Sequence, residues 1–428
     1  MTPRIDLGPF PTRPGFDDVR RRDVDDPLAS FAARFEVADP SLIYLDGNSL
    51  GRLPSAAPAV IDHVVRAQWG DRLIRSWNEG WWDLASDVGD LIAPLIGAGP
   101  GEVIVSESTT TNLHKLAGAA LDARPERTTL VTDDLNFPSD IHVLAGLAAR
   151  SGRELCVVGS DGVDGPVDGL LAAIDETTAL VSLSSTAFKS GYTYDLAAIT
   201  AAAHDVGALV LWDLSHSAGA VEIDLGGVGA DLAVGCTYKF LNGGPGSPAF
   251  LYVRRDLQDE LHNPITGWWG DADPFEFGLD HAPATGIRRF QVGTAPVLSL
   301  AATAPGIELV AEAGMPAIAV KGRALVEFVR ELADERLVPL GFRWASPRQP
   351  ARCGAAAALA HADAWRITRA LIEIGNVVPD FRTPDNLRLG LSPLTTSFVD
   401  VHTAIERLAL IVESGIHESF TPDRTAVT

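Results

Sequence analysis

The chain has 428 residues, 46% of them hydrophobic and 21% charged, which is an ordinary composition for a globular protein. This length is too great for one compact core, so two domains are expected. The formal net charge of −22 repels phosphate backbones and anionic lipid headgroups, and it argues against nucleic acid or a membrane surface as the main partner.

The cysteines and the N-terminus predict a cytoplasmic protein. Cys156, Cys236 and Cys353 are far apart and form no Cys-x-x-Cys pair, which fits a reducing compartment. No apolar run precedes a small-residue cleavage site near the N-terminus, so no secretory signal is expected. Even the apolar stretch Ala295–Leu309 is interrupted by two prolines and a glutamate, so no membrane span is predicted.

In chain order, the predicted elements begin with an arm. Residues 1–50 are assigned to this arm, because the first forty are rich in Pro, Asp and Arg. Apolar spacing then predicts helices at Pro58–Trp69 and Ser86–Ile96, and a strand at Glu102–Ser106. The pattern next alternates, with strands expected at 128–132, 154–158, 179–184, 208–213, 233–236 and 249–253, and helices at 140–150, 167–175 and 196–206.

Two domains follow from this order of elements. Short apolar strands that alternate with helices of about ten residues are typical of βαβ units around a buried, mainly parallel sheet. Residues 51–297 are therefore predicted to form a large α/β domain. From residue 298 the character changes, with helices expected at Ala301–Ala313, Pro316–Leu332 and Val399–Val412. Residues 298–428 are predicted to form a smaller α+β domain.

Polar residues follow three of the predicted strands, at the sheet edge where ligands bind in open parallel sheets. Asp213 ends one strand, Lys239 follows another, and Thr109 and Thr110 begin a predicted helix after a third. Pyridoxal phosphate needs such a set: an amine for a Schiff base, a carboxylate for the pyridine nitrogen, and a helix N-terminus for the phosphate. Each residue alone is more often a cap, a turn former or a solvated charge, but the set in this order favours the cofactor.

Six strings in the chain carry a family resemblance. They are YLDGNSLG (44–51), LIRSWN (73–78), NFPSD (136–140), WDLSHSAG (212–219), CTYKFLNGGPGS (236–247) and GWWG (267–270). From about residue 40 to 412 the chain resembles the kynureninase family. The resemblance implies a pyridoxal-phosphate enzyme of fold type I, with a mainly parallel seven-stranded sheet in the large domain. It implies hydrolysis of the Cβ–Cγ bond of L-kynurenine, and of its 3-hydroxy derivative, to anthranilate (or 3-hydroxyanthranilate) and L-alanine, in tryptophan catabolism and NAD biosynthesis.

The resemblance also implies the residues of a pyridoxal-phosphate site, without a metal. Lys239 is expected to carry the cofactor as a Schiff base and to move protons, Asp213 to face the pyridine nitrogen, and Tyr238 to donate a proton late in the reaction. The cofactor site implied within one subunit consists of Thr109, Thr110, Phe137, Asp140, Ser184, Asp213, His216, Tyr238 and Lys239. Trp268 and Thr294 are expected to reach the same site from the partner subunit, which implies a homodimer.

Substrate contacts are implied in the same way. Arg388 matches the arginine that holds the substrate α-carboxylate in a bidentate fork, and Asn48 and Trp81 are expected near the substrate. Trp81 and Thr294 resemble bacterial forms that prefer kynurenine over its 3-hydroxy derivative.

Two motifs depart from the family pattern. Where the family often has GWFGH, this chain has GWWGD, with Trp269 and Asp271. Where the family has WDLAH, this chain has WDLSH, with Ser215. These changes leave the catalytic groups in place and bear on the aryl pocket.

Two other interpretations of the sequence are open. A cysteine desulfurase, or another enzyme of the class V aminotransferase type, shares the fold and the lysine, and Cys353 lies 114 positions after Lys239. Its context, ARCGAAAALA, indicates a buried strand, where a thiol is usually inert. The alternative from a different class is a catalytically silent pyridoxal-phosphate protein, but such relatives usually lose the lysine or the ring aspartate, and both are present here.

Overall fold

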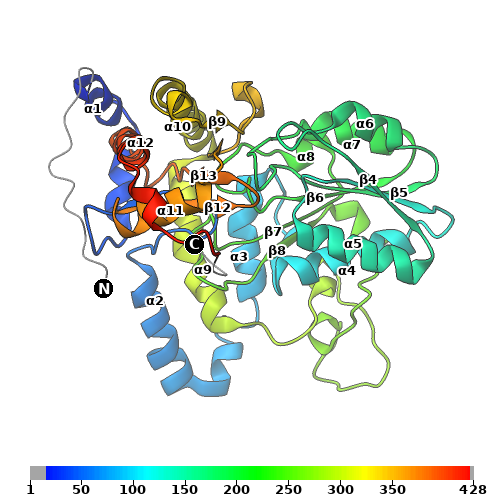
Figure 1. Cartoon of the computed structure of the whole chain (residues 1–428). Helices are drawn as coiled ribbons and strands as arrows, with labels where there is room; N and C mark the ends of the chain where they lie inside the picture. The colour runs from blue at the N-terminus through cyan, green and yellow to red at the C-terminus, as the bar shows by residue number, and fades with distance from the viewer. Residues whose placement is uncertain (1–15, 425–428) are drawn as a thin grey trace.

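Three β-sheets organise the chain, and the computed structural model describes residues 16–424 (Figure 1). Residues 1–15 of the predicted arm lie outside this range. The largest sheet has seven strands, in the order β2 (Val103–Val105), β8 (Phe250–Val253), β7 (Leu232–Gly235), β6 (Leu209–Asp213), β5 (Thr178–Ser184), β3 (Thr129–Asp133) and β4 (Glu154–Val158).

The seven-stranded sheet is mainly parallel, which confirms the predicted fold class. Strands β3 to β7 are parallel, and β8 runs antiparallel to both β7 and β2. Two helices lie on one face of the sheet, α4 (Thr109–Asp122) and α5 (Pro138–Ser151) (Figure 1). The other face is covered by α6 (Val167–Ala173), α7 (Leu196–Asp205) and α8 (Leu225–Val228). With both faces covered, the central strands β5, β6 and β7 are buried at every position instead of alternating.

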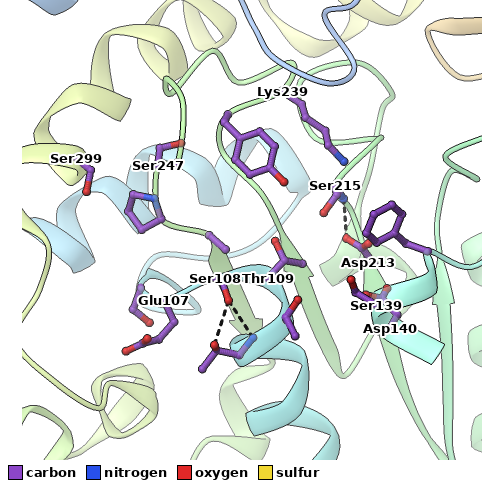
Figure 2. Close-up of a pocket in the computed structure, with 18 of the residues that line it drawn as sticks. Glu107, Ser108, Thr109, Ser139, Asp140, Asp213, Ser215, Lys239, Ser247 and Ser299 are labelled. Carbon is purple, nitrogen blue, oxygen red and sulfur yellow. Dashed lines mark hydrogen bonds between the residues drawn. The ribbon is translucent and has the colours of Figure 1, made fainter. Parts of the chain in front are cut away.

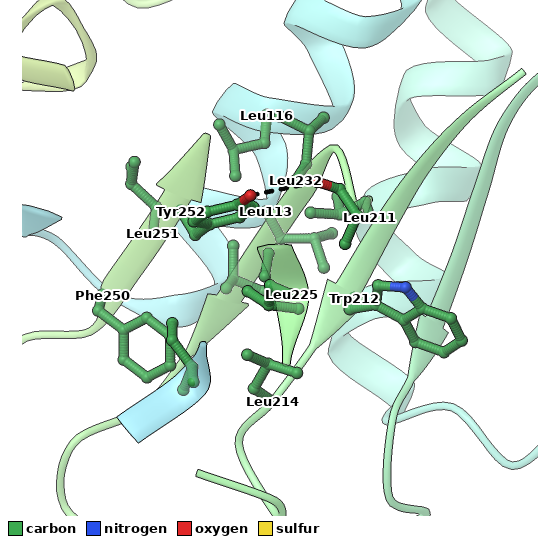
Figure 3. Packing of buried hydrophobic residues seen from close by; sticks show 14 of the residues in the cluster. Leu113, Leu116, Leu211, Trp212, Leu214, Leu225, Leu232, Phe250, Leu251 and Tyr252 are labelled. Carbon is green, nitrogen blue, oxygen red and sulfur yellow. Dashed lines mark hydrogen bonds between the residues drawn. The ribbon is translucent and has the colours of Figure 1, made fainter. Parts of the chain in front are cut away.

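The main hydrophobic core lies between this sheet and its helices. Leu113 and Leu116 of α4 lie beside Leu211, Leu232 and Leu251 of the strands, and all five are fully buried (Figure 3). Each such leucine contributes about 1.5–3 kcal/mol relative to an exposed one. The core therefore fixes α4 and β6–β8 relative to one another.

A second core lies around the four-stranded antiparallel sheet. Its strands are β12 (Asp380–Arg382), β13 (Asn386–Gly390), β10 (Ala356–Ala360) and β9 (Arg343–Trp344), and its helices are α10 (Met315–Arg336), α11 (Ala364–Glu373) and α12 (Phe398–Glu413). The described part of the predicted arm joins this region. There α1 (Phe16–Val24) packs against α12, and β1 (Ile43–Tyr44) pairs with β11 (Val377–Val378). The predicted boundaries at residues 50 and 298 stay predictions.

The helices between the two cores differ in part from those predicted. The helix expected at 58–69 is α2 (Ala57–His63), which continues as a π-helix over Val64–Arg72. The helix expected at 86–96 begins two residues earlier as α3 (Leu84–Ile92), and its last part, Ala93–Ile96, is a 3-10 helix. Among the described residues, no single helix has the length and apolar composition to span a bilayer. The pair α9 (Val297–Ala313) and α10, bent at 86°, meets that criterion only when the two helices are joined.

Helix α9 approaches the loop after β7 very closely. A Cβ atom at Gly306 would lie 2.3 Å from the carbonyl oxygen of Leu241 and 2.6 Å from that of Asn242. Only glycine allows this contact between the helix and the loop backbone, so the loop that carries Lys239 is supported from behind by α9.

Gly306→Ala is therefore expected to destabilise the fold by about 1–3 kcal/mol, because the added methyl group must displace backbone atoms. The matched control is Gly146→Ala in α5, where an added Cβ meets nothing within 4 Å. That change is expected to be neutral or to stabilise by up to about 1 kcal/mol. Urea unfolding of both variants measures the difference, and equal stability would contradict the close contact.

Candidate active site

A cavity of about 730 Å³ opens at the carboxyl ends of β6 and β7. Ten of the residues predicted for the site within one subunit line it: Asn48, Thr109, Thr110, Phe137, Asp140, Asp213, His216, Tyr238, Lys239 and Arg388. Thr294 was expected to reach the site from the partner subunit, but it also lines the cavity of its own chain. They come from widely separated parts of the sequence. The parallel sheet brings the strand ends to one edge, as expected for this architecture.

Lys239 projects into the cavity from the loop after β7. Its Nζ lies 2.8 Å from Nε2 of His216. Burial lowers the pKa of His216 well below its usual range, and the positive charge of Lys239 acts in the same direction. A neutral imidazole can accept a hydrogen bond from the ammonium group. The loop itself is held by backbone hydrogen bonds, including Asn242 N–H to the Lys239 carbonyl at 2.9 Å.

Two carboxyl groups face each other on the wall toward which Lys239 points (Figure 2). Asp213 ends β6 and accepts the backbone N–H of Ser215 at 2.8 Å, and Asp140 lies in the first turn of α5. Burial raises the pKa of Asp140 well above its usual range, and the neighbouring charge of Asp213 raises it further. Both effects favour the neutral form of the Asp140 carboxyl group. Its Oδ2 is buried and receives no hydrogen bond from a described residue.

The N-terminus of α4 forms another part of the cavity wall. Ser108 is the N-cap and accepts the backbone N–H of Thr111 at 3.2 Å, while Thr109 and Thr110 begin the helix (Figure 2). The first N–H groups of a helix have no partner within the helix, and they carry partial positive charge. This end of α4, with two hydroxyl groups beside it, suits a bound phosphate.

Aromatic rings and a buried arginine complete the cavity. Phe137 lies with its ring centroid 5.9 Å from Lys239 Nζ and packs edge-on against Phe188. Arg388 on β13 is 1% exposed, and it donates to Asp380, to Ser49 and to the carbonyl oxygen of Phe188. Burial raises the pKa of Tyr238 above its ordinary value, which already lies well above neutral pH.

Three of the predicted site residues do not line this cavity. Ser184 is buried behind the wall, opposite Asp213 in the parallel register, and its hydroxyl donates to Asn136 at 2.7 Å. Trp81 lines a separate apolar pocket of about 470 Å³, which shares residues 295, 296 and 299 with the main cavity. Trp268, which was expected to reach the site of the partner subunit and not this one, is 42% exposed and packs edge-on against Trp269.

The two departures from the family pattern have different surroundings. Trp269 is buried in a cluster with Trp77 and Trp82 and does not line the cavity. Ser215 does line it, and its backbone N–H is the group that bonds Asp213.

Several lining residues were not predicted, among them Ser49, Phe188 and Arg382. Arg382 could have been found from its spacing, because it stands six positions before Arg388 in a segment with hairpin character. Its place on the cavity wall depends on the register of β12 and β13, which the sequence does not show.

Comparison with known proteins identifies the family. Residues 61–353 match the class V aminotransferase family, and residues 318–408 match the kynureninase C-terminal domain. A kynureninase from Pseudomonas fluorescens is 41% identical over 404 residues, which cover 93% of this chain and 95% of that protein. One from Burkholderia pseudomallei is 42% identical over 399 residues, covering 92% of this chain and 94% of that protein.

The chain belongs to the kynureninase family. Solved structures of lower identity share the fold. A cysteine desulfurase from Thermococcus onnurineus superimposes with a TM-score of 0.76 at 19% identity, over 93% of this chain and 98% of that one. A cysteine desulfurase from Escherichia coli gives a TM-score of 0.75 at 17% identity, over 90% and 98%. At these identities the likeness concerns the architecture alone.

The kynureninase family uses pyridoxal phosphate, and the cavity fits this group. Lys239 supplies an amine, the end of α4 suits a phosphate, and the buried Oδ2 of Asp140 has no donor among the described residues. The pair of Asp213 and Asp140 can face a protonated pyridine nitrogen, since one charge on the pair balances one charge on the ring.

The two carboxyl groups are expected to respond differently to amide substitution. Asp140→Asn replaces a protonated acid by a neutral group of the same shape, so cofactor affinity should fall by less than about tenfold. Asp213→Asn removes the charge that faces the ring, and we expect a loss of at least about a hundredfold. Titration of each apoprotein with pyridoxal phosphate, followed by visible absorbance, measures both values. A larger loss for Asp140→Asn would show that the proton is assigned to the wrong carboxyl group.

Proposed function

We propose that this protein hydrolyses the Cβ–Cγ bond of L-kynurenine, and of its 3-hydroxy derivative, to give anthranilate or 3-hydroxyanthranilate and L-alanine. The observation that carries the proposal is the convergence of Lys239, Asp213 and the N-terminus of α4 on one cavity. Membership of the kynureninase family supports the choice of substrate, since the curated relatives of 41–42% identity bear that name.

Each part of the cavity has a proposed task toward pyridoxal phosphate. Lys239 is proposed to hold it covalently, Thr109, Thr110 and Tyr238 to hold its phosphate, and Phe137 and His216 to flank the ring. When bound, this group supplies an electron sink for the bonds broken at the substrate.

The proton transfers are proposed for two neighbouring side chains. With the cofactor bound and the substrate in place, the Lys239 amine would be able to take the proton from the substrate Cα, and neutral His216 at 2.8 Å would help to hold this amine in place. Water adds to the γ-carbonyl carbon of the substrate before the Cβ–Cγ bond breaks. Tyr238 carries a proton at neutral pH, as a tyrosine ordinarily does, and it is proposed to give this proton to Cβ as alanine forms.

Lys239→Ala is expected to lower anthranilate release from L-kynurenine by at least about a thousandfold, because both the covalent attachment and the proton transfer are lost. Anthranilate fluorescence measures the rate, with L-kynurenine and 3-hydroxykynurenine assayed in parallel. Turnover above a few per cent of wild type would contradict the proposed role.

Cys353→Ala provides the control that separates this function from sulfur transfer. Cys353 is buried, its thiol lies 3.4 Å from the carbonyl oxygens of Pro347 and Gln349, and it does not line the cavity. Burial raises the pKa of this thiol to about 11, so little thiolate forms at neutral pH. Kynurenine cleavage should be unchanged in this variant, whereas a desulfurase would lose its activity.

We also propose that the protein is a cytoplasmic homodimer with active sites at the subunit interface. In the described part of the chain, two neighbouring segments, residues 69–82 and 268–277, carry exposed apolar side chains. They include Trp69 and Ile74 in the first segment, and Trp268, Phe275 and Phe277 in the second. Rings of the two segments touch, with centroids of Trp82 and Phe275 5.6 Å apart. Monomers rarely expose such a surface, which supports a second copy as its partner.

Mixed subunits test the shared site. Trp268→Ala and Lys239→Ala should each be inactive alone. If Trp268 acts in the partner's site, a hybrid dimer of the two variants has one site in which both residues are intact. About half of the dimers in a random mixture are hybrids, so the mixture should regain about a quarter of wild-type activity. The subunits are unfolded together, refolded with cofactor and assayed. No recovery from a mixture that refolds to dimers would contradict the assignment of Trp268 to the partner subunit.

A further inference from the structure

Asp380 is a buried carboxylate between two arginines at the cavity. It lies on β12, opposite Arg388 of β13 in the antiparallel register. Arg388 Nη2 donates to Asp380 Oδ2, and Arg382 Nη2 lies 2.8 Å from the same oxygen. Because two guanidinium groups share one carboxylate, this wall keeps one positive charge that the pair with Asp380 does not neutralise.

A second carboxyl group near this wall cancels that charge only in part at neutral pH, and less below it. Burial, together with the charge of Asp380, raises the pKa of Asp46 to about 7, while Ser49, Arg388 and Arg382 act in the opposite direction. Below that pH Asp46 is mostly neutral, so the wall remains suited to an anion.

Arg388 has little hydrogen-bonding capacity left for a ligand. Its Nη1 donates to the carbonyl oxygen of Phe188, and its Nη2 donates to Asp380 and, at 3.0 Å, to Ser49. In the amide orientation that satisfies both of its partners, Asn48 accepts from Arg388 Nε at 3.0 Å. A guanidinium group has five N–H donors, and these four contacts leave one. A carboxylate has two oxygens, so it needs a second donor from elsewhere.

Arg382 stands where that donor is needed. It lines the same cavity as Arg388, and its side chain is 36% exposed although it pairs with the buried Asp380. Its Nη1 donates to the carbonyl oxygen of Phe381 at 3.2 Å, and its Nη2 is 3.5 Å from Ser49. The ion pair with Asp380 fixes the end of a long side chain that would otherwise lose rotamer freedom on binding a ligand.

We propose that Arg382 is a second carboxylate-binding residue of this site, and that Asp380 is the positioning residue for both arginines. The inference rests on the proposed function, because it takes the ligand to be an α-amino acid. One arginine alone would bind the carboxylate through a single N–H, and the pair supplies one donor for each oxygen.

Arg382→Gln tests the first half of the proposal in the holoenzyme. The dissociation constant of L-alanine and the KM of L-kynurenine should each rise about tenfold, with kcat changed by less than about threefold, because a charge-assisted hydrogen bond to the carboxylate is lost. The dissociation constant of L-alaninamide, which lacks the carboxylate, should not change. Equal weakening of both ligands, or of neither, would overturn the role of Arg382.

The matched control is Arg343→Gln. Arg343 lies in the same small sheet, pairs with Asp385 at 3.1 Å, is 73% exposed and does not line the cavity. This variant should bind both ligands as wild type does. Arg382→Lys keeps the charge without the planar fork, so its affinity for L-alanine should fall between those of wild type and Arg382→Gln.

Asp380→Asn separates positioning from net charge. Loss of the carboxylate makes the wall more positive, so a purely electrostatic role predicts tighter binding of L-alanine. Positioning predicts weaker binding, with L-alaninamide little affected, because both arginines lose their fixed partner. Tighter binding would overturn the role of Asp380.

The outcomes distinguish this inference from the function on which it rests. If wild type binds L-alanine in a manner that depends on Arg382 but releases no anthranilate from L-kynurenine, the proposed function fails and the arginine pair stands. If wild type cleaves kynurenine and Arg382→Gln binds L-alanine normally, the function stands and the inference fails.

Discussion

Parallel pairing of β6 with β7 is the constraint on which the candidate site depends. Parallel neighbours end at the same edge of a sheet, so Asp213, the last residue of β6, and Lys239, just beyond β7, reach one cavity. Strand β5 ends beside them, and α4 begins at the same edge. An amine, a carboxyl pair and a helix N-terminus thus meet although more than a hundred residues separate the first from the last.

The second core supplies the two arginines that line the cavity. The β12–β13 hairpin places Arg388 and Arg382 at the cavity, and Arg388 Nη1 bonds the carbonyl oxygen of Phe188, which lies two hundred residues earlier in the chain. Helix α9 packs in the core of the large sheet and touches the lysine loop through the backbone of Gly306, and α10 has residues in both cores. The site is therefore built mainly on the large sheet and is completed by residues of the second core.

The sequence predicted the secondary structure and the site residues that depend on local sequence. Buried strands and their helices follow from apolar periodicity, and Asp213 and Lys239 follow from their places at strand ends. Features set by tertiary register were missed, since Asp380 becomes the partner of two arginines only when the hairpin pairs. Ser184 was expected in the cavity but points behind the wall, and Trp81 lies in the adjoining pocket. These placements depend on how segments far apart in the sequence pack together, and composition does not record this.

Reduction with borohydride tests the central claim most directly. Treatment of the holoprotein with borohydride reduces any imine to a stable secondary amine. The protein is then digested, and mass spectrometry locates the labelled residue. We expect a single phosphopyridoxyl group, on Lys239. A label on another lysine, or none on protein whose bound pyridoxal phosphate has been verified before reduction, would contradict the account.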